Sequence, residues 1–144
     1  MSAAKELDPA THEVIKAHSA KGDEYADAEN YEAAIAEYNK AWLIVPEPKT
    51  EWNASTWLLA AIGDAAFKGG YNTSAKEALQ YAMHCPSGIG NPFLHLRLGQ
   101  VLYDSGDEQG AADELMRAYM AEGEEIFASE DARYLDFLKR WTKL

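Results

Sequence analysis

The chain has a single cysteine, no long apolar run and few cationic side chains, and each shortage excludes a class of protein. Cys85 has no second cysteine to pair with, so the chain cannot form an internal disulfide. No stretch approaches the roughly 18 consecutive apolar residues of a transmembrane helix. The first residues, from Met1 to Asp8, lack the apolar core of a signal peptide. We therefore expect a cytoplasmic protein that does not enter a membrane.

Acidic side chains far outnumber basic ones. The 144 residues include 24 Asp and Glu against 13 Lys and Arg, so the formal net charge is −11. Such a charge repels phosphate groups, so we expect neither a nucleic-acid nor an anionic membrane partner. The hydrophobic share of 47% suits a folded chain, and this length can bury a core without a disulfide or metal. We predict one domain over residues 1–144.

The residue patterns that carry enzymatic or metal chemistry are also missing. The four histidines, His12, His18, His84 and His95, form no His-Glu-x-x-His motif, and one cysteine allows no Cys-x-x-Cys motif. Cys85 directly follows His84, and side chains of adjacent residues do not easily meet as a nucleophile pair. His18 and His95 each precede a glycine by four residues, a position that we expect inside a helix pair. We predict no enzyme, no metal and no cofactor.

A spacing of glycine, alanine and a large residue recurs three times. The offsets are 12, 4 and 3 residues, in the sets Gly22, Ala34, Tyr38, Ala41; Gly63, Ala75, Leu79, Ala82; and Gly99, Ala111, Leu115, Ala118. A small residue in the first helix of an antiparallel pair lets the second helix approach closely. Alanines then occupy the crossings, and the large residue fills the gap. Because one pair cannot bury its apolar face alone, we expect the pairs to stack.

This pattern resembles the tetratricopeptide repeat (TPR) family. The first unit fits best, with Gly22, Tyr25, Ala34, Tyr38 and Pro46 among the matching residues. The resemblance implies an all-α fold of about three TPR-like antiparallel helix pairs, stacked as a short right-handed solenoid. The units cover about residues 12–48, 49–90 and 91–123, and a capping helix follows at about 129–143. Extra residues in 49–55 and 86–91 lengthen the steps between units.

Caps and periodicity predict seven helices, near residues 12–28, 31–45, 50–68, 73–84, 92–106, 107–122 and 129–143. Thr11 is the expected N-cap of the first helix, and Asn91 caps the fifth, with Pro92 at its first position. Ser129 is expected to start the last helix, and Gly69-Gly70 to end the third.

The first helix of each pair is expected to line the concave side of the solenoid. Helical spacing from the three glycines places eight candidate partner-binding residues there: Asp23, Trp57, Asp64, Phe67, Phe93, Gln100, Tyr103 and Asp104. Aromatics ringed by carboxylates are typical of a protein-binding hot spot. We expect Trp57 and Tyr103 to be exposed. Phe67 and Phe93 either join them or pack against a neighbouring helix, and the carboxylates either bind a partner or are simply solvated.

Two resemblances bear on function. Some TPR proteins clamp a C-terminal carboxylate with lysine and asparagine on this face, but here those places include Asp23, Asp64 and Gln100, which excludes such a clamp. Residues 52–65, 90–100 and 112–120 resemble small stand-alone bacterial TPR proteins that look like immunity partners of polymorphic toxins. That resemblance implies a protein partner, a basic toxin domain that the chain binds and blocks. The alternative is a TPR adaptor or secretion chaperone that holds an extended peptide in its concave groove.

Overall fold

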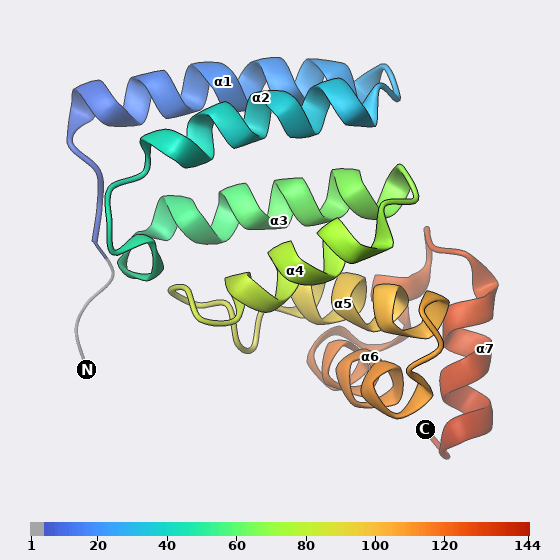
Figure 1. The fold of residues 1–144 in the computed structure, drawn as a ribbon. Coiled ribbons are helices and arrows are strands. Elements are labelled where there is room, and N and C mark those ends of the chain that lie inside the picture. Colours follow the sequence, from blue (N-terminus) through green and yellow to red (C-terminus); the bar gives the residue numbers. More distant parts are fainter. Residues whose placement is uncertain (1–4) are drawn as a thin grey trace. The chain divides into compact units, whose positions relative to one another are not determined.

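The computed structural model describes residues 5–144, which fold into α-helices with no strand among them (Figure 1). The all-α fold expected from the sequence is confirmed. The helices are α1 (Pro9–Asp27), α2 (Tyr31–Ile44), α3 (Asn53–Lys68), α4 (Asn72–Ala82), α5 (Pro92–Asp104), α6 (Glu108–Glu122) and α7 (Ala132–Trp141). Two short 3-10 helices, η1 (Lys49–Glu51) and η2 (Gly123–Phe127), lie between them.

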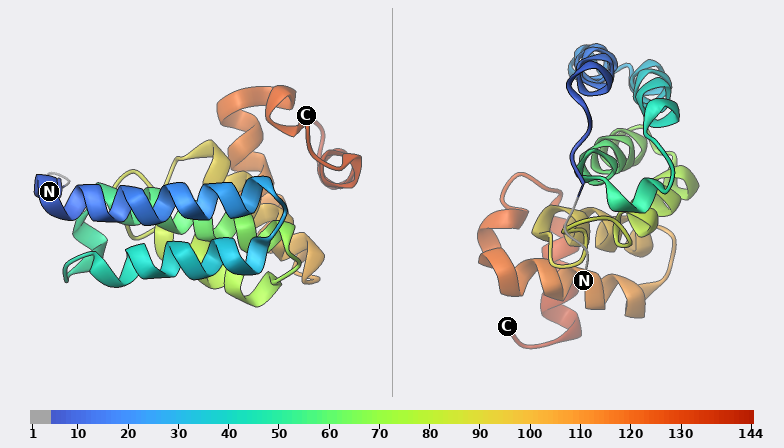
Figure 2. Two further views of the ribbon diagram at one scale, coloured as in Figure 1. Left: turned by 90° about the horizontal axis from the view of Figure 1, so that it is seen from above. Right: turned by 90° about the vertical axis from the view of Figure 1, so that its left-hand side faces the viewer.

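The chain forms two compact units, which we describe separately. The N-terminal unit ends at Gly88 and contains α1–α4, and the C-terminal unit begins at Ile89 and contains α5–α7. In the N-terminal unit, α1 packs against α2, α2 against α3, and α3 against α4. Figures 1 and 2 show α1 and α2 as a side-by-side antiparallel pair. In the C-terminal unit, α5 packs against α6, and α7 packs against α6 and η2.

The recurrent glycines are the points where paired helices come closest. A Cβ atom added to Gly22 would lie 2.5 Å from the ring of Tyr38, and one added to Gly63 would lie 2.6 Å from the Leu79 side chain. At Gly99 the added atom would lie 2.6 Å from Leu115. These distances are too short for any real Cβ, so a side chain at the glycine would push the helices apart. Each glycine thus faces the large residue that the sequence pattern assigned to it.

Side-chain caps start most of the helices. Asn91 accepts hydrogen bonds from two N–H groups of α5, as expected, and Pro92 occupies the first position. The expected Thr11 cap is wrong: Asp8 accepts from the Thr11 N–H at 3.0 Å, and α1 begins at Pro9. The expected start at Ser129 is also wrong, because Asp131 caps α7.

The helix expected from residue 50 begins at Asn53, so residues 49–52 lie outside α3 while residues 53–55 form its first turn. Residues 49–52 form η1 and an extended step at Trp52, beside which the N-terminal segment lies. The Lys5 N–H donates to the Glu51 carbonyl at 2.9 Å, and the Asn53 N–H donates to the Lys5 carbonyl at 3.2 Å. Trp52 packs against a buried cluster that includes Ile15 and Leu58. This strap of main chain therefore closes one end of the α1–α3 core.

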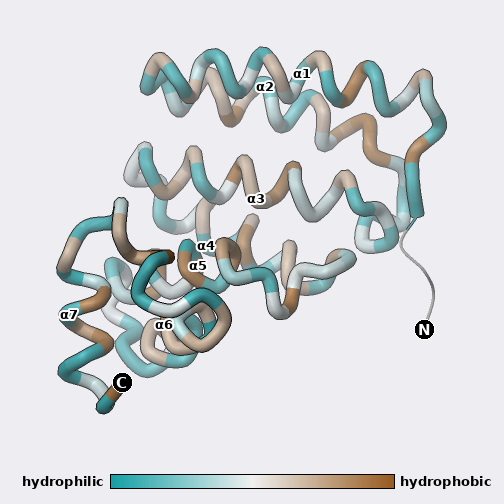
Figure 3. The backbone as a smooth tube through the Cα atoms, turned by 180° about the vertical axis from the view of Figure 1, so that it is seen from behind, coloured by the Kyte–Doolittle hydropathy of each residue, from teal (hydrophilic) through white to brown (hydrophobic). Residues whose placement is uncertain are grey.

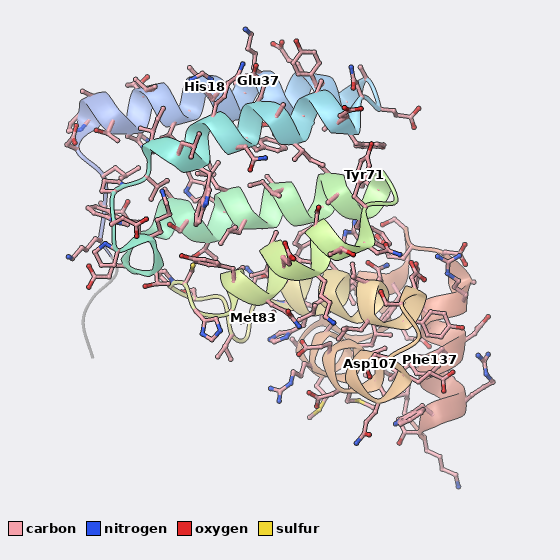
Figure 4. The ribbon with its side chains drawn as sticks, in the orientation of Figure 1. His18, Glu37, Tyr71, Met83, Asp107 and Phe137 are labelled. Atoms are coloured by element: carbon pink, nitrogen blue, oxygen red, sulfur yellow. The ribbon has the colours of Figure 1, made fainter. Side chains whose placement is uncertain are left out.

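Two histidines lie between paired helices, as the sequence predicted. In the N-terminal unit, His18 on α1 hydrogen-bonds Glu37 on α2 at 3.2 Å (Figure 4). In the C-terminal unit, His95 on α5 hydrogen-bonds Glu114 on α6 at 2.5 Å. The other ring nitrogen of His95 accepts the Gly90 N–H at 2.8 Å. Both histidines therefore join the two helices of a pair.

Apolar residues occur in short stretches rather than long runs. Figure 3 shows hydrophobic and hydrophilic positions alternating along α7, a pattern typical of an amphipathic helix. Tyr134, Phe137 and Leu138 form its buried side. Within residues 5–144, no helix has the length and apolar character that crossing a bilayer requires.

Candidate functional site

The charges of three carboxylates act on the hydroxyl of Tyr38 in the N-terminal unit. Tyr38 belongs to α2, and its ring passes over Gly22 towards the side of α1 that carries Asp23. The hydroxyl donates to Asp23 Oδ1 at 2.6 Å. Burial raises the pKa of Tyr38 above its usual value, and the charges of Asp23, Asp64 and Asp27 act in the same direction. We call Asp23, Asp27 and Asp64 the acidic face of this unit.

An exposed tryptophan and a phenylalanine share a side of α3 with Asp64. Trp57 precedes Asp64 by seven residues, which is two helical turns, and 38% of its surface is exposed. Phe67 follows Asp64 by three residues and is half-buried. Asp64 also forms an ion pair with Lys68, in which Asp64 Oδ2 and Lys68 Nζ are 3.2 Å apart. Four of the predicted residues (Asp23, Trp57, Asp64 and Phe67) therefore belong to α1 and α3 of one unit.

The charges of the acidic face are only partly balanced. Asp23 accepts a hydrogen bond from the neutral Tyr38 hydroxyl, and Asp64 forms an ion pair with the partly exposed Lys68. Asp27 is exposed and forms no ion pair with any residue in 5–144. A cation brought to Asp23 and Asp27 would gain Coulomb energy without first breaking an ion pair of either one. This part of the surface is consequently suited to a basic group on another molecule.

In the C-terminal unit, the predicted residues meet the chain's own last helix. Gln100 is fully buried, and its Nε2 donates to Glu130 at 2.8 Å while its carbonyl oxygen accepts from Arg97. Arg97 also forms an ion pair with Glu130 at 2.5 Å. Gln100 therefore contributes to internal packing, and its expected place on an accessible face is not observed. The reason is that the segment leading into α7 folds back over α5.

Tyr103 and Asp104 are held by α7 in the same way. The Tyr103 ring lies 4.8 Å from the Phe137 ring and 5.8 Å from the Tyr134 ring, measured between centroids. Asp104 accepts from the Tyr134 hydroxyl at 2.8 Å and from Arg133 at 3.1 Å. Burial and then the Asp104 hydrogen bond raise the pKa of Tyr134 to about 12. Tyr103 is half-buried, so its expected exposure is only partial.

Phe93 has a different position from the other residues of this unit. It lies in the first turn of α5, and 37% of its surface is exposed. The Arg97 guanidinium is 5.0 Å from the centre of its ring, a cation–π distance. Two of the four predicted residues in this unit have aromatic side chains, and Phe93 is more exposed than Tyr103.

Sequence reasoning missed a groove in the N-terminal unit. The groove has a volume of about 280 Å³ and lies between α2 and α4, with α3 as its floor. Trp42 and Tyr81 meet edge to face across it, with ring centroids 5.4 Å apart. Ile35, Asn39 and Glu77 also line it. The sequence signal is the set of partly apolar positions on the second helices of the first two pairs, whereas helical spacing from the three glycines selects residues on the first helices alone.

Comparison with known proteins adds no assignment. No protein-family model matches the chain, and no curated protein shows significant similarity to it.

Proposed function

We propose that this chain is a TPR-like helical-repeat protein that binds another protein and, most specifically, an immunity protein that blocks a basic bacterial toxin domain. The single observation that carries the binding proposal is the surface of α1 and α3, where exposed Asp23 and Asp27 accompany exposed Trp57. The three helix pairs with glycine contacts at the same register support the repeat architecture. The toxin assignment comes from the sequence resemblance alone.

Charge and aromatic exposure have separate roles in this proposal. A net charge of −11 steers a basic partner towards the chain and raises the association rate constant at low salt. Trp57 supplies a large apolar surface whose burial slows dissociation. The chain acts by occupying the partner's active site, so it needs no catalytic group of its own, and it works in the cytoplasm of the cell that makes the toxin.

The first test is capture of the partner. Tagged protein is incubated with lysate of its native strain, washed at low and at high salt, and the retained proteins are identified by mass spectrometry. One stoichiometric partner that survives high salt and loses its toxic activity in the complex supports the proposal. Many weak partners lost on washing support the peptide-binding adaptor instead and contradict the immunity function.

The second test assigns the surface. With the purified partner, Asp27→Lys should slow association several-fold at low salt and have less effect at high salt, because the charge acts over a Debye length. Asp136→Lys is the matched control, because Asp136 is an exposed aspartate on α7 in the other unit and the charge change is equal. Equal slowing by both variants would mean that net charge alone acts, and an unchanged rate with Asp27→Lys would exclude this surface.

A further inference from the structure

The groove between α2 and α4 in the N-terminal unit has the composition of a docking surface. Its apolar lining comes from Ile35 and Trp42 on α2, from Leu59 and Ile62 on α3, and from Tyr81 on α4. A second hollow shares Ile35 and Ser74 with it and extends to Tyr71, which directly precedes α4. The groove is therefore an elongated channel between two helices rather than an isolated pit.

Two aromatic side chains hold the groove in shape. Trp42 and Tyr81 pack edge to face, an arrangement that fixes both rings. The Lys49 ammonium lies 4.9 Å from the centre of the Trp42 ring, and its Nζ donates to the main-chain carbonyls of Trp42 and Val45 at 2.7 Å each. Because these contacts already exist in the free chain, little side-chain ordering remains to be done on binding.

The charges that line the groove are all of one sign. Glu32 and Glu77 are the charged side chains among its lining residues, and neither forms an ion pair with another residue in the described part of the chain, 5–144. Burial raises the pKa of Tyr81, and the charge of Glu47 acts in the same direction. An apolar channel flanked by carboxylates favours an occupant with aliphatic or aromatic side chains on one side and cations beside them.

The C-terminal unit contains an occupant of this chemistry on another acidic, aromatic surface. There α7, which carries Arg133, Lys139 and Arg140, places its aromatic side on Tyr103 of α5, and Arg133 pairs with Asp104. A cationic amphipathic helix is thus the kind of element that a face of this chain already binds. Two helices with a channel between them also present the ridges and grooves against which a third helix packs.

We propose that the α2/α4 groove binds a cationic amphipathic helix of a protein partner, with its apolar side against Trp42 and Tyr81 and its cations near Glu32 and Glu77. This surface lies on the second helices of the first two pairs, apart from the α1/α3 surface of the proposed function. It therefore gives the chain a second site of contact, which does not depend on the partner being a toxin.

The test uses a defined probe and the indole N–H resonances of the four tryptophans. The probe is a peptide of about 14 residues, or four helical turns, with leucines on one side and lysines on the other. Its control has glutamate in place of every lysine. We expect the lysine peptide to shift the Trp42 indole resonance saturably while the Trp57 resonance stays in place, and the glutamate peptide to have no effect.

Two variants locate the binding. Glu77→Lys should weaken the lysine peptide at least five-fold, whereas Glu13→Lys, an equal charge change at an exposed glutamate of α1, should leave its affinity within two-fold. Ser74→Tyr fills the channel from an exposed position, so the fold should be retained while binding is lost.

Four results would overturn the proposal. They are a shift of Trp57 without Trp42, equal binding of the glutamate peptide, equal loss with Glu13→Lys, and a concentration-dependent shift of Trp42 in the protein alone. The last result would assign the groove to a second copy of this chain. Because Trp57 reports on the α1/α3 surface and Trp42 on the groove, failure of one proposal is distinguishable from failure of the other.

Discussion

Substitution of Gly63 by alanine tests the packing of α3 against α4 directly. The added Cβ would lie 2.6 Å from Leu79 Cδ2 and 2.7 Å from Leu79 Cγ, and Leu79 is fully buried. Alanine stabilises a helix interior by about 1 kcal/mol relative to glycine. Overpacking of a tight contact costs about 1–3 kcal/mol. Moving Cγ requires a change of the χ1 rotamer of Leu79, which its buried surroundings oppose, so we expect a net loss of up to about 2 kcal/mol.

A double-mutant cycle separates the two effects. Leu79→Ala alone should cost about 2–5 kcal/mol, because it leaves a cavity in the core. In that background the Gly63→Ala change meets no leucine, so it should stabilise by about 1 kcal/mol through helix propensity. The coupling energy between the two positions is then about 1–3 kcal/mol, which is the cost of overpacking that Leu79→Ala removes. Urea unfolding followed by circular dichroism and by tryptophan fluorescence measures all four chains, and coincident transitions verify two-state behaviour.

Two further variants control this experiment. Ala17→Gly on the exposed side of α1 measures helix propensity without any contact, with an expected loss of about 1 kcal/mol. Gly99→Ala should cost more than Gly63→Ala, because the Leu115 main-chain nitrogen lies 3.0 Å from the added atom and a backbone atom cannot rotate away.

If Gly63→Ala raised the stability of the otherwise unchanged chain, the close approach of α3 and α4 at this glycine would be refuted.

Two other predictions concern the C-terminal unit. Glu130→Ala removes the acceptor of the buried Gln100 Nε2 and should cost about 1–3 kcal/mol in thermal unfolding, whereas Glu130→Gln, which keeps an acceptor oxygen, should cost less; equal losses would contradict the hydrogen-bond argument. Because the pKa of Tyr134 is raised to about 12 from its usual 10, folding favours its neutral form, so its contribution to stability is complete below pH 10 and is lost as the pH rises towards 12. Between pH 10 and pH 12, the free energy of unfolding should therefore fall less in Tyr134→Phe than in the unchanged chain, as measured by urea midpoints at several pH values. The same pH dependence in both chains would contradict the assignment.

The features that could be predicted from the sequence are those with a local steric cause. The contact of Gly22 with Tyr38 requires a missing side chain at one position and a large one at a fixed offset, so a repeated spacing reveals it. The Asn91 cap with Pro92 after it is equally local. The positions of His18 and His95 inside their helix pairs followed from the same register.

The fate of Gln100, Tyr103 and Asp104 could not be predicted in this way. Their partners on and before α7 lie about 30 residues further along the chain, as with Tyr103 and Phe137 or Asp104 and Arg133. No period in the sequence connects these segments, because α7 occurs once and has no counterpart in the other pairs. The amphipathic pattern of α7 predicts that its apolar side covers part of the preceding helices. Which side of those helices it covers depends on the path of η2 and on the Glu130 contacts.

The distribution of charge decides which of the predicted residues remain available to a partner. Four of the 13 cationic residues lie in or just after α7, namely Arg133, Lys139, Arg140 and Lys143, so this helix is the basic part of an acidic chain. Arg133 neutralises Asp104, and the aromatic side of α7 covers Tyr103. Within the C-terminal unit, a basic partner would have to displace an internal helix of similar chemistry before it reached these two residues. Asp23 and Asp27 on α1 remain exposed, and binding there has no such displacement cost. We therefore expect a basic partner to make its first contact with α1.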